Sequence, residues 1–520
     1  MVDIDWRQGA TLDEARPRQL EDLCAAARVR ALGAIVLRDA GRTATWEQLE
    51  SWSAAIAAHW SERIAPGQCV VIVGPNGLEH LLTELACWRL AAIAAPLCVN
   101  QGQTQLTAAV ARLKPTLVVT SVALTRVTPR DSTWCDLASI MTLASVMTLS
   151  QSGSGVPAAW RPARPDTPCL ILGTSGSSGQ PRGVLLSQDN LCSQQAAFAQ
   201  IWPEVGPGDR LAAYLPWHHS FGSLAERLWS LCRGAELTVV PGGGRDREQL
   251  LATVQAVAPT VLMSVPKIHR TLTQAGVLDP AILRWAFTAG AVLGMDEEIW
   301  YAKHGIPVYE GWGLTETSPS AVITTPGRRR VPGIVGTPIP GVRVGVTADR
   351  HIVISGPGVM LGYVDDPVAT AAIRLPSAAG SDWMLDSGDL GEWTEHGLRL
   401  IGRADQVVKL DNGEKVVLSV LVDHLECGPA IRHAVVLIHD GRMTALVHAV
   451  EVITDAEIVA EISHINRGIE ASYARIQSAW RLTQPVSCEN GFLTPSHKVA
   501  RGAWIEAFTK GPAFRRLACP

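Results

Sequence analysis

The first half of the chain alternates short apolar runs with stretches of helical length. Val70–Val73 (VVIV) is followed by a helical stretch, Leu78–Leu90, and then by a second apolar run, Ala91–Leu97. Further strand candidates follow along the chain: Thr116–Thr120, Leu211–Leu215, Glu236–Val240 and Thr260–Ser264. Alternation of this kind predicts an α/β fold with layers of helices on largely parallel sheets.

Short strands become dominant in the last third of the chain. From about Val342 onward they indicate a smaller β-rich unit, with candidates at Val342–Val346, His351–Ile354, Gly391–Thr394 and Leu398–Ile401. After Gly402–Asp405, further short strands precede a helical stretch, Asp455–Ala474. A chain of 520 residues exceeds the usual size of one domain. We therefore predict a large N-terminal domain, residues 1–403, of layered α/β subdomains plus the β-rich unit, and a small α+β C-terminal domain, residues 404–520.

Composition excludes several classes of protein. Hydrophobic residues make up 47% and charged residues 18%, so the chain can bury a large core and is not expected to be disordered. A net charge of −4 gives no basic surface for a nucleic acid. The 11 cysteines contain no C-x-x-C pair, which argues against a zinc site or a disulfide framework.

No targeting or membrane segment is expected. The N-terminus lacks the basic start and apolar run of a secretory signal. The most apolar long stretch, Leu81–Val99, carries Glu84 and Arg89, which favours a buried element over a transmembrane span. These features predict a cytoplasmic protein.

A Ser/Thr/Gly-rich loop follows the strand candidate Cys169–Leu172. Glycines let the backbone N–H groups approach an anion, hydroxyl groups donate further hydrogen bonds to phosphate oxygens, and an arginine adds positive charge. The loop lacks the lysine spacing of a Walker motif. Its composition alone would also suit a flexible linker, but the preceding strand and the apolar run after Gly183 favour an ordered phosphate loop. Its candidate contacts are Thr174, Ser175, Gly176, Ser177, Ser178, Gly179 and Arg182.

The segment Thr174–Gly183 resembles the signature of the adenylate-forming superfamily, which includes acyl- and aryl-CoA synthetases, luciferases and peptide-synthetase adenylation domains. The family usually ends this segment with Pro-Lys-Gly, and its lysine contacts the outgoing pyrophosphate. This chain has Arg182 instead. Arginine keeps the charge and can bind phosphate in bidentate fashion, but it is bulkier and planar. The resemblance therefore implies ATP binding more firmly than a normal turnover rate.

A second motif, Val308–Ser318 (VYEGWGLTETS), follows in the family's order. The resemblance assigns Thr315 to the α-phosphate, Glu316 to Mg²⁺ and catalysis, and Trp312, flanked by Gly311 and Gly313, to the adenine wall. An aromatic face suits a flat base, and a carboxylate suits Mg²⁺. Taken alone, the motif would suit an ordinary strand-to-helix turn with Thr315 as N-cap equally well.

Three weaker motifs complete the expected nucleotide site and hinge. The resemblance assigns the small residues of Phe287–Val292 to the adenine and acyl pockets, Asp389 and Arg403 to the ribose, and Asp405 to the hinge of the small domain. Taken alone, small residues usually mean tight packing, and Ser387-Gly388-Asp389 would be an ordinary turn. The candidate small residues are Ala289, Gly290 and Ala291.

The segment Phe492–Arg501 resembles the lysine-bearing segment of long-chain acyl-CoA synthetases. The resemblance makes Lys498 the catalytic residue of adenylation, bridging the substrate carboxylate and the α-phosphate. A lone lysine near a terminus is otherwise a solvated charge.

The substrate is addressed by Leu215–Arg227, whose His218-His219-x-Phe221-Gly222 core resembles luciferases and aryl-CoA ligases and whose continuation resembles long-chain acyl-CoA synthetases. We expect His219 near the acyl carboxylate and the ATP phosphates, although packing is the commonest fate of such histidines. No acidic or Cys partner stands at metal-ligand spacing. The apolar pocket wall favours a fatty acid over an amino acid.

Three hypotheses for function follow. The first is an AMP-forming acyl-CoA ligase that uses ATP, Mg²⁺ and CoA. The second keeps adenylation but passes the acyl group to the phosphopantetheine arm of an acyl carrier protein or to another nucleophile. The third is a nucleotide-binding protein that has lost turnover, which only Arg182 suggests.

Overall fold

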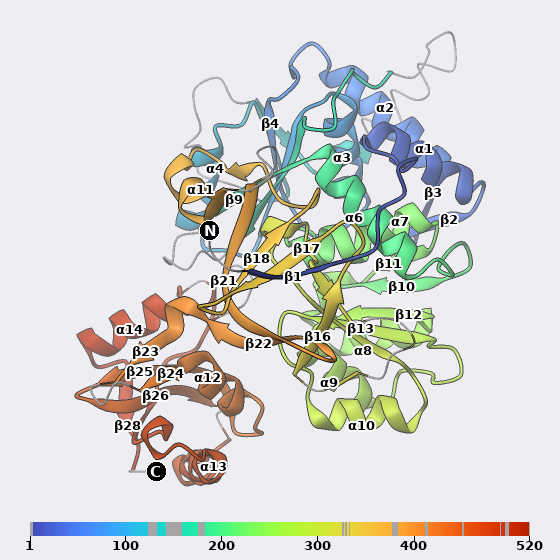
Figure 1. Ribbon diagram of the computed structural model, residues 1–520. Helices are drawn as coiled ribbons and strands as arrows, with labels where there is room; N and C mark the ends of the chain where they lie inside the picture. Colours follow the sequence, from blue (N-terminus) through green and yellow to red (C-terminus); the bar gives the residue numbers. More distant parts are fainter. Residues whose placement is uncertain are drawn as a thin grey trace.

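The computed structural model has a mixed α/β fold, with most of the chain in one large body and the last hundred or so residues in a smaller one (Figure 1). It describes residues 4–122, 133–141, 159–174, 182–324, 327, 330–331, 333–376, 383–410, 414–449, 452–488, 490–494 and 499–518.

The first sheet of the large body has seven strands and contains the alternating pattern seen in the sequence. Its inner strands β8, β5, β4, β6 and β7 run parallel where they pair, whereas β9 and β19 are antiparallel. Their order is β19 (Gly362–Tyr363), β9 (Arg182–Ser187), β8 (Pro168–Thr174), β5 (Ile93–Leu97), β4 (Cys69–Val73), β6 (Leu117–Thr120) and β7 (Thr133–Asp136).

A second sheet of eleven strands joins the predicted β-rich stretch to a parallel part. Strands β12, β13 and β14 are parallel, and the others are antiparallel, so parallel pairing is confined to part of each sheet. The order is β1 (Ile4–Gln8), β17 (Arg343–Thr347), β18 (His351–Ser355), β21 (Trp383–Thr394), β22 (Gly397–Arg403), β16 (Ile334–Pro338), β15 (Val322–Ile323), β14 (Val308–Trp312), β13 (Trp285–Ala289) and β12 (Val261–Ser264), with β20 (Arg374–Pro376) beside β21.

A third sheet of four strands completes the large body, in the order β10 (Arg210–Ala213), β11 (Glu236–Val239), β2 (Ile35–Asp39) and β3 (Arg42–Thr45). The remaining elements of this body are α1 (Leu20–Arg30), α2 (Trp46–Trp60), α3 (Leu78–Arg89), α4 (Gln103–Leu113), α6 (Gln188–Ile201), the π-helix η1 (Phe221–Leu228), α7 (Trp229–Arg233), η2 (Pro241–Gly244), α8 (Arg247–Val257), α9 (Pro266–Ala275), α10 (Met295–Lys303), η3 (Thr315–Thr317) and α11 (Pro367–Ile373).

The cores show how these layers pack. Residues of α4 share one core with one face of the seven-stranded sheet, and α2, α3 and α6 share another core with the opposite face. Helices α8, α9 and α10 cover the β12–β13 region. The ring of Trp202 stacks on that of Trp285, with ring centroids 4.9 Å apart. Because Trp202 directly follows α6 and Trp285 begins β13, this stacking packs α6 against the eleven-stranded sheet.

The smaller body has its own apolar core, formed by buried side chains from Val416 to Leu517. It comprises η4 (Ala404–Gln406), β23 (Val407–Lys409), β24 (Lys415–Val417), α12 (Leu418–Glu426), β25 (Ile431–His439), β26 (Arg442–Ala449), α13 (Asp455–Gly468), η5 (Ser472–Ala474), β27 (Ser478–Leu482), α14 (Arg501–Lys510) and β28 (Phe514–Arg516).

Two expectations need correction. The helix expected over Asp455–Ala474 ends at Gly468, because the next residue, Ile469, adopts an extended conformation. The strand expected over Gly391–Thr394 begins earlier, at Trp383, so that β21 includes Ser387-Gly388-Asp389; within it Gly388 has φ +69° and the register shifts between Leu390 and Gly391. Among the described residues, no helix is both long and apolar enough to cross a membrane.

Candidate active site

The Ser/Thr/Gly segment connects two antiparallel strands. Thr174 ends β8 opposite Arg182, which begins β9, and Gly173 lies opposite Gly183. Both ends of the predicted loop are therefore fixed by the sheet. Its central candidates lie outside the described residues, as does Lys498: they are Ser175, Gly176, Ser177, Ser178 and Gly179.

Arg182 is oriented by two neighbours that sequence reasoning missed. Strand β19 pairs with β9 and brings Tyr363 beside the arginine, whose guanidinium carbon lies 5.4 Å from the centre of the Tyr363 ring. The Nε atom of Arg182 is also 3.6 Å from Oδ2 of Asp366. A planar guanidinium suits this stacking better than a lysine ammonium would. The neighbours thus accommodate an arginine at this position.

The Tyr363 hydroxyl also donates a hydrogen bond of 2.6 Å to Oε1 of Glu316. Burial raises the pKa of Glu316, while the Tyr363 bond and the positive charges of Arg403 and Arg182 act in the opposite direction. The neighbouring Thr315 hydroxyl lies 3.2 Å from the Ser220 hydroxyl, at the start of η1. Hydroxyls, a carboxylate and an arginine from four parts of the chain therefore meet at one place.

The glycines around Trp312 are required by close packing. A Cβ atom on Gly311 would lie 2.4 Å from Cζ of Phe287, and one on Gly313 would lie 2.1 Å from the carbonyl oxygen of Pro319. Gly311 pairs with Ala289 across β13 and β14. The predicted small-residue motif and the Trp312 motif are therefore adjacent in the sheet. The next residues, Gly290 and Ala291, follow the end of β13, and Gly290 has φ +87°.

Asp389 accepts hydrogen bonds from two of the predicted residues. The indole Nε1 of Trp312 donates to its Oδ2 atom at 2.9 Å, and Nη1 of Arg403 donates to its Oδ1 atom at 2.8 Å. Arg403 lies opposite Asp389 in the β21–β22 pair, and its Nε atom is 3.6 Å from Oδ1 of Asp405. The predicted adenine, ribose and hinge residues form one connected chain of contacts.

His219 lies just before η1, with its ring centroid 4.5 Å from that of His218. The following residue, Ser220, contacts Thr315, so the histidine segment reaches the same site. Sequence reasoning missed Tyr363, Asp366 and Ser220, because no spacing in the sequence links them to Glu316 or Arg182. The pairing of β19 with β9 places Tyr363 and Asp366 beside Arg182.

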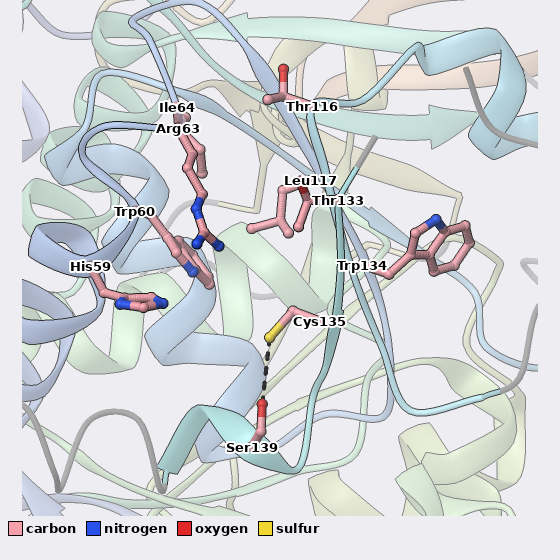
Figure 2. Close-up of a pocket in the computed structure, with 10 residues that line it drawn as sticks. All are labelled: His59, Trp60, Arg63, Ile64, Thr116, Leu117, Thr133, Trp134, Cys135 and Ser139. Carbon is pink, nitrogen blue, oxygen red and sulfur yellow. Dashed lines mark hydrogen bonds between the residues drawn. The ribbon is translucent and has the colours of Figure 1, made fainter. Parts of the chain in front are cut away.

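A cavity of about 390 Å³ lies elsewhere in the large body. Arg63 and Trp60 point from the end of α2 toward Leu117 and Cys135 at the sheet edge (Figure 2). The cavity shares no lining residue with the site around Glu316. Over the part of the chain that is described, no group of three or more His, Cys, Asp or Glu side chains could hold a metal ion.

Comparison with known proteins agrees with this geometry. Residues 24–364 match the sequence profile of the family described as AMP-binding enzyme. The chain is 27% identical over 445 residues to long-chain-fatty-acid–CoA ligase FadD15 of Mycobacterium bovis, spanning 69% of this chain and 72% of the relative. It is 29% identical over 421 residues to phosphinothricin tripeptide synthetase PhsC of Streptomyces viridochromogenes, spanning 76% of this chain and 37% of that relative.

The fold is similar to those of two solved structures. The first is o-succinylbenzoate coenzyme A synthetase from Bacillus subtilis in complex with AMP, with a TM-score of 0.76, 18% identity, and coverage of 92% of this chain and 97% of that chain. The second is ATP-bound MatB from Rhodopseudomonas palustris, with a TM-score of 0.72, 22% identity, and coverage of 93% and 98%.

Proposed function

This chain belongs to the family of AMP-binding enzymes, and from that premise we propose that it activates a fatty acid as an acyl-adenylate and transfers the acyl group to CoA. In the first step a carboxylate oxygen of the acid attacks the α-phosphorus of ATP, and pyrophosphate leaves. In the second step the CoA thiol attacks the acyl carbon, and AMP leaves.

One observation carries the proposal: Arg182, Tyr363, Glu316 and Thr315 meet at the end of the phosphate loop. The donor set fits the substrates. Oxygen ligands such as the Glu316 carboxylate are those that Mg²⁺ prefers, and Arg182 supplies charge for a phosphate. A bound Mg²⁺ would neutralise negative charge on the phosphate oxygens.

We assign the remaining roles from the contacts. Asp389, whose two carboxylate oxygens accept hydrogen bonds from Trp312 and Arg403, would accept the ribose hydroxyls. Thr315 would bind the α-phosphate, and His219 would lie at the acid carboxylate. Lys498 would bridge the carboxylate and the α-phosphate, where a preorganised charge stabilises the transition state most. Ala289, Gly290, Ala291, Gly311 and Gly313 would form the walls beside adenine and acyl group.

We also propose that residues 404–520 rotate as a small domain about Asp405 between the two steps. The separate apolar core of this part and the short η4 turn at Ala404–Gln406 support a division at Arg403. A few residues at the end of an element commonly absorb such a rotation.

The proposal names a fatty acid as the acid substrate and CoA as the acyl acceptor. Similarity to long-chain-fatty-acid–CoA ligases supports both. Similarity to PhsC favours one alternative, in which a carrier protein is the acceptor.

The test is acid-dependent exchange of labelled pyrophosphate into ATP, measured over a panel of fatty, aryl and amino acids. We expect exchange with fatty acids, followed by CoA-dependent release of AMP. Exchange without any response to CoA, but with transfer to a carrier protein, would replace CoA as the acceptor. ATP binding without exchange across the panel would overturn the enzymatic proposal.

A further inference from the structure

A buried ion pair lies next to the segment that carries His218 and His219. None of the catalytic or binding roles proposed above involves it. Arg227 in η1 and Glu84 in α3 pair with both side chains fully buried, each with 0% exposure. The Nη2 atom of Arg227 donates a hydrogen bond of 2.9 Å to the Ser223 hydroxyl. Taking two charges out of water is unfavourable, and apolar side chains of similar size would often stabilise the fold as well or better. The pair therefore calls for an explanation other than stability.

The pair contacts Trp217, the residue before His218. The guanidinium carbon of Arg227 lies 5.0 Å from the Trp217 ring centre, and the His80 ring meets Trp217 edge-on at 5.5 Å and 87°. Burial lowers the pKa of His80 to about 4, so its ring is neutral at pH 7. Trp217 itself is fully buried. The contacts with Arg227 and His80 therefore fix the orientation of the Trp217 ring.

The backbone of the same segment is fixed as well. The Asn76 side chain donates to the Leu215 carbonyl at 2.8 Å and accepts from the Trp217 N–H at 3.0 Å. On the other side, the Ser223 N–H donates to the His219 carbonyl at 2.8 Å. The Nε2 atoms of His218 and His219 are buried from water. The histidine pair thus lies on a turn that is held from both ends.

We propose that Arg227, Glu84 and Asn76 are positioning residues that fix the Trp217–His219 turn and so direct His219 toward the site at Thr315. The inference rests on the proposed function for the role of His219. Directional contacts explain the buried ion pair, because apolar side chains could not provide the hydrogen bond to Ser223 or the cation beneath Trp217.

The first test needs no catalytic activity. Diethylpyrocarbonate modifies accessible histidine rings, and mass spectrometry of peptides measures its rate at His218–His219. In the double variant Arg227→Met/Glu84→Met we expect this rate to rise at least about fivefold, because the turn opens more often. The exposed His304 serves as internal standard. An unchanged rate in a variant that still unfolds cooperatively would overturn the proposal.

Two further variants control for folding. Asn76→Ala removes the backbone contacts without touching a charge, and we expect the same direction of change. Arg16→Met breaks a different, partly buried ion pair, that of Arg16 with Asp189. This variant should leave the rate of diethylpyrocarbonate modification at His218–His219 unchanged. A matching rise in Arg16→Met would mean general loosening and would also overturn the proposal.

Kinetics separate positioning from stability. For Arg227→Met/Glu84→Met we expect the KM for the acid to rise about tenfold, because small misplacement of a contact is costly, and the Kd for ATP to change much less. Arg227→Lys keeps a cation beside Glu84, so the KM for the acid should rise less than in the double variant. An equal rise in the KM for the acid and in the Kd for ATP would contradict the inference. If no acid supports exchange in the unsubstituted protein, the proposed function fails, while the histidine rates still decide the positioning role.

Discussion

The carboxylate of Asp389 is oriented by a hydrogen bond to each of its oxygens. It is buried, and Trp312 and Arg403 each donate to one of its oxygens. Replacing it by Asn removes the charge and forces one donor to lose its partner. We expect Asp389→Asn to weaken ATP binding by about tenfold or more, since hydrogen bonds to charged groups are the stronger ones. Calorimetric titration with ATP measures the change, and Asp386→Asn, on the same strand but paired with His351, should bind ATP normally.

Lys498 is a prediction from sequence alone. We expect Lys498→Ala to slow adenylate formation by about 100- to 1,000-fold, the usual cost of losing one preorganised donor to a developing charge. Thioester formation from supplied acyl-adenylate should remain. Single-turnover assays of the two steps check this, and Lys510→Ala, at an exposed pair with Glu506, is the matched control. Normal adenylation by Lys498→Ala would assign the role to another residue.

Glu226 gives a prediction about pH. The residue is fully buried, and burial raises the pKa of its carboxyl well above the ordinary value. Because the folded state holds a proton that the unfolded state releases, the stabilisation present below the unfolded pKa is lost as pH rises. Glu226→Gln has no such proton. As pH rises from 5 to 8, the free energy of unfolding of Glu226→Gln should therefore increase relative to that of the unsubstituted protein. The increase should be at most about 1.4 kcal/mol per pH unit. Urea unfolding at both pH values measures the difference, and a constant difference would contradict it.

At the scale of elements, β14 ends in a turn that has no room for a side chain. The Cβ of an alanine at position 313 would lie 2.1 Å from the Pro319 carbonyl oxygen, so the backbone must move. We expect Gly313→Ala to destabilise the protein by about 1 to 3 kcal/mol in urea unfolding, as overpacking does. Gly502→Ala, in α14 with open space around it, should be neutral or stabilising. Equal effects of the two changes would show that packing at β14 is not the cause.

At the scale of the whole molecule, the link between the two cores passes through Arg403 and η4. If the small domain turns about Asp405, a proline there should restrict the turn, because its ring fixes φ. We expect Asp405→Pro to keep adenylation within a few-fold and to slow thioester formation by about tenfold or more. Rapid-quench measurement of each step tests this, with Asp405→Ala as control. A parallel loss in both steps would argue against a hinge at this position.

Local sequence pattern was enough to predict several of the elements and the family. Strong periodicity and apolar runs predicted strands β4 and β6 and helix α3 to within two residues at each end, because local pattern decides whether a segment can bury one face. The order of the motifs from Thr174 to Lys498 indicated the adenylate-forming family, and the match over residues 24–364 confirms it.

Which side chains meet at the site depends on the long-range pairing of strands. Tyr363 reaches Glu316 and Arg182 because β19 pairs with β9, and Trp312 reaches Asp389 because β14 and β21 belong to one sheet. Long-range pairing of this kind leaves no periodic trace in the chain. The family signature at Thr174–Gly183 was therefore readable from its residues, whereas the tyrosine that stacks on Arg182 was not.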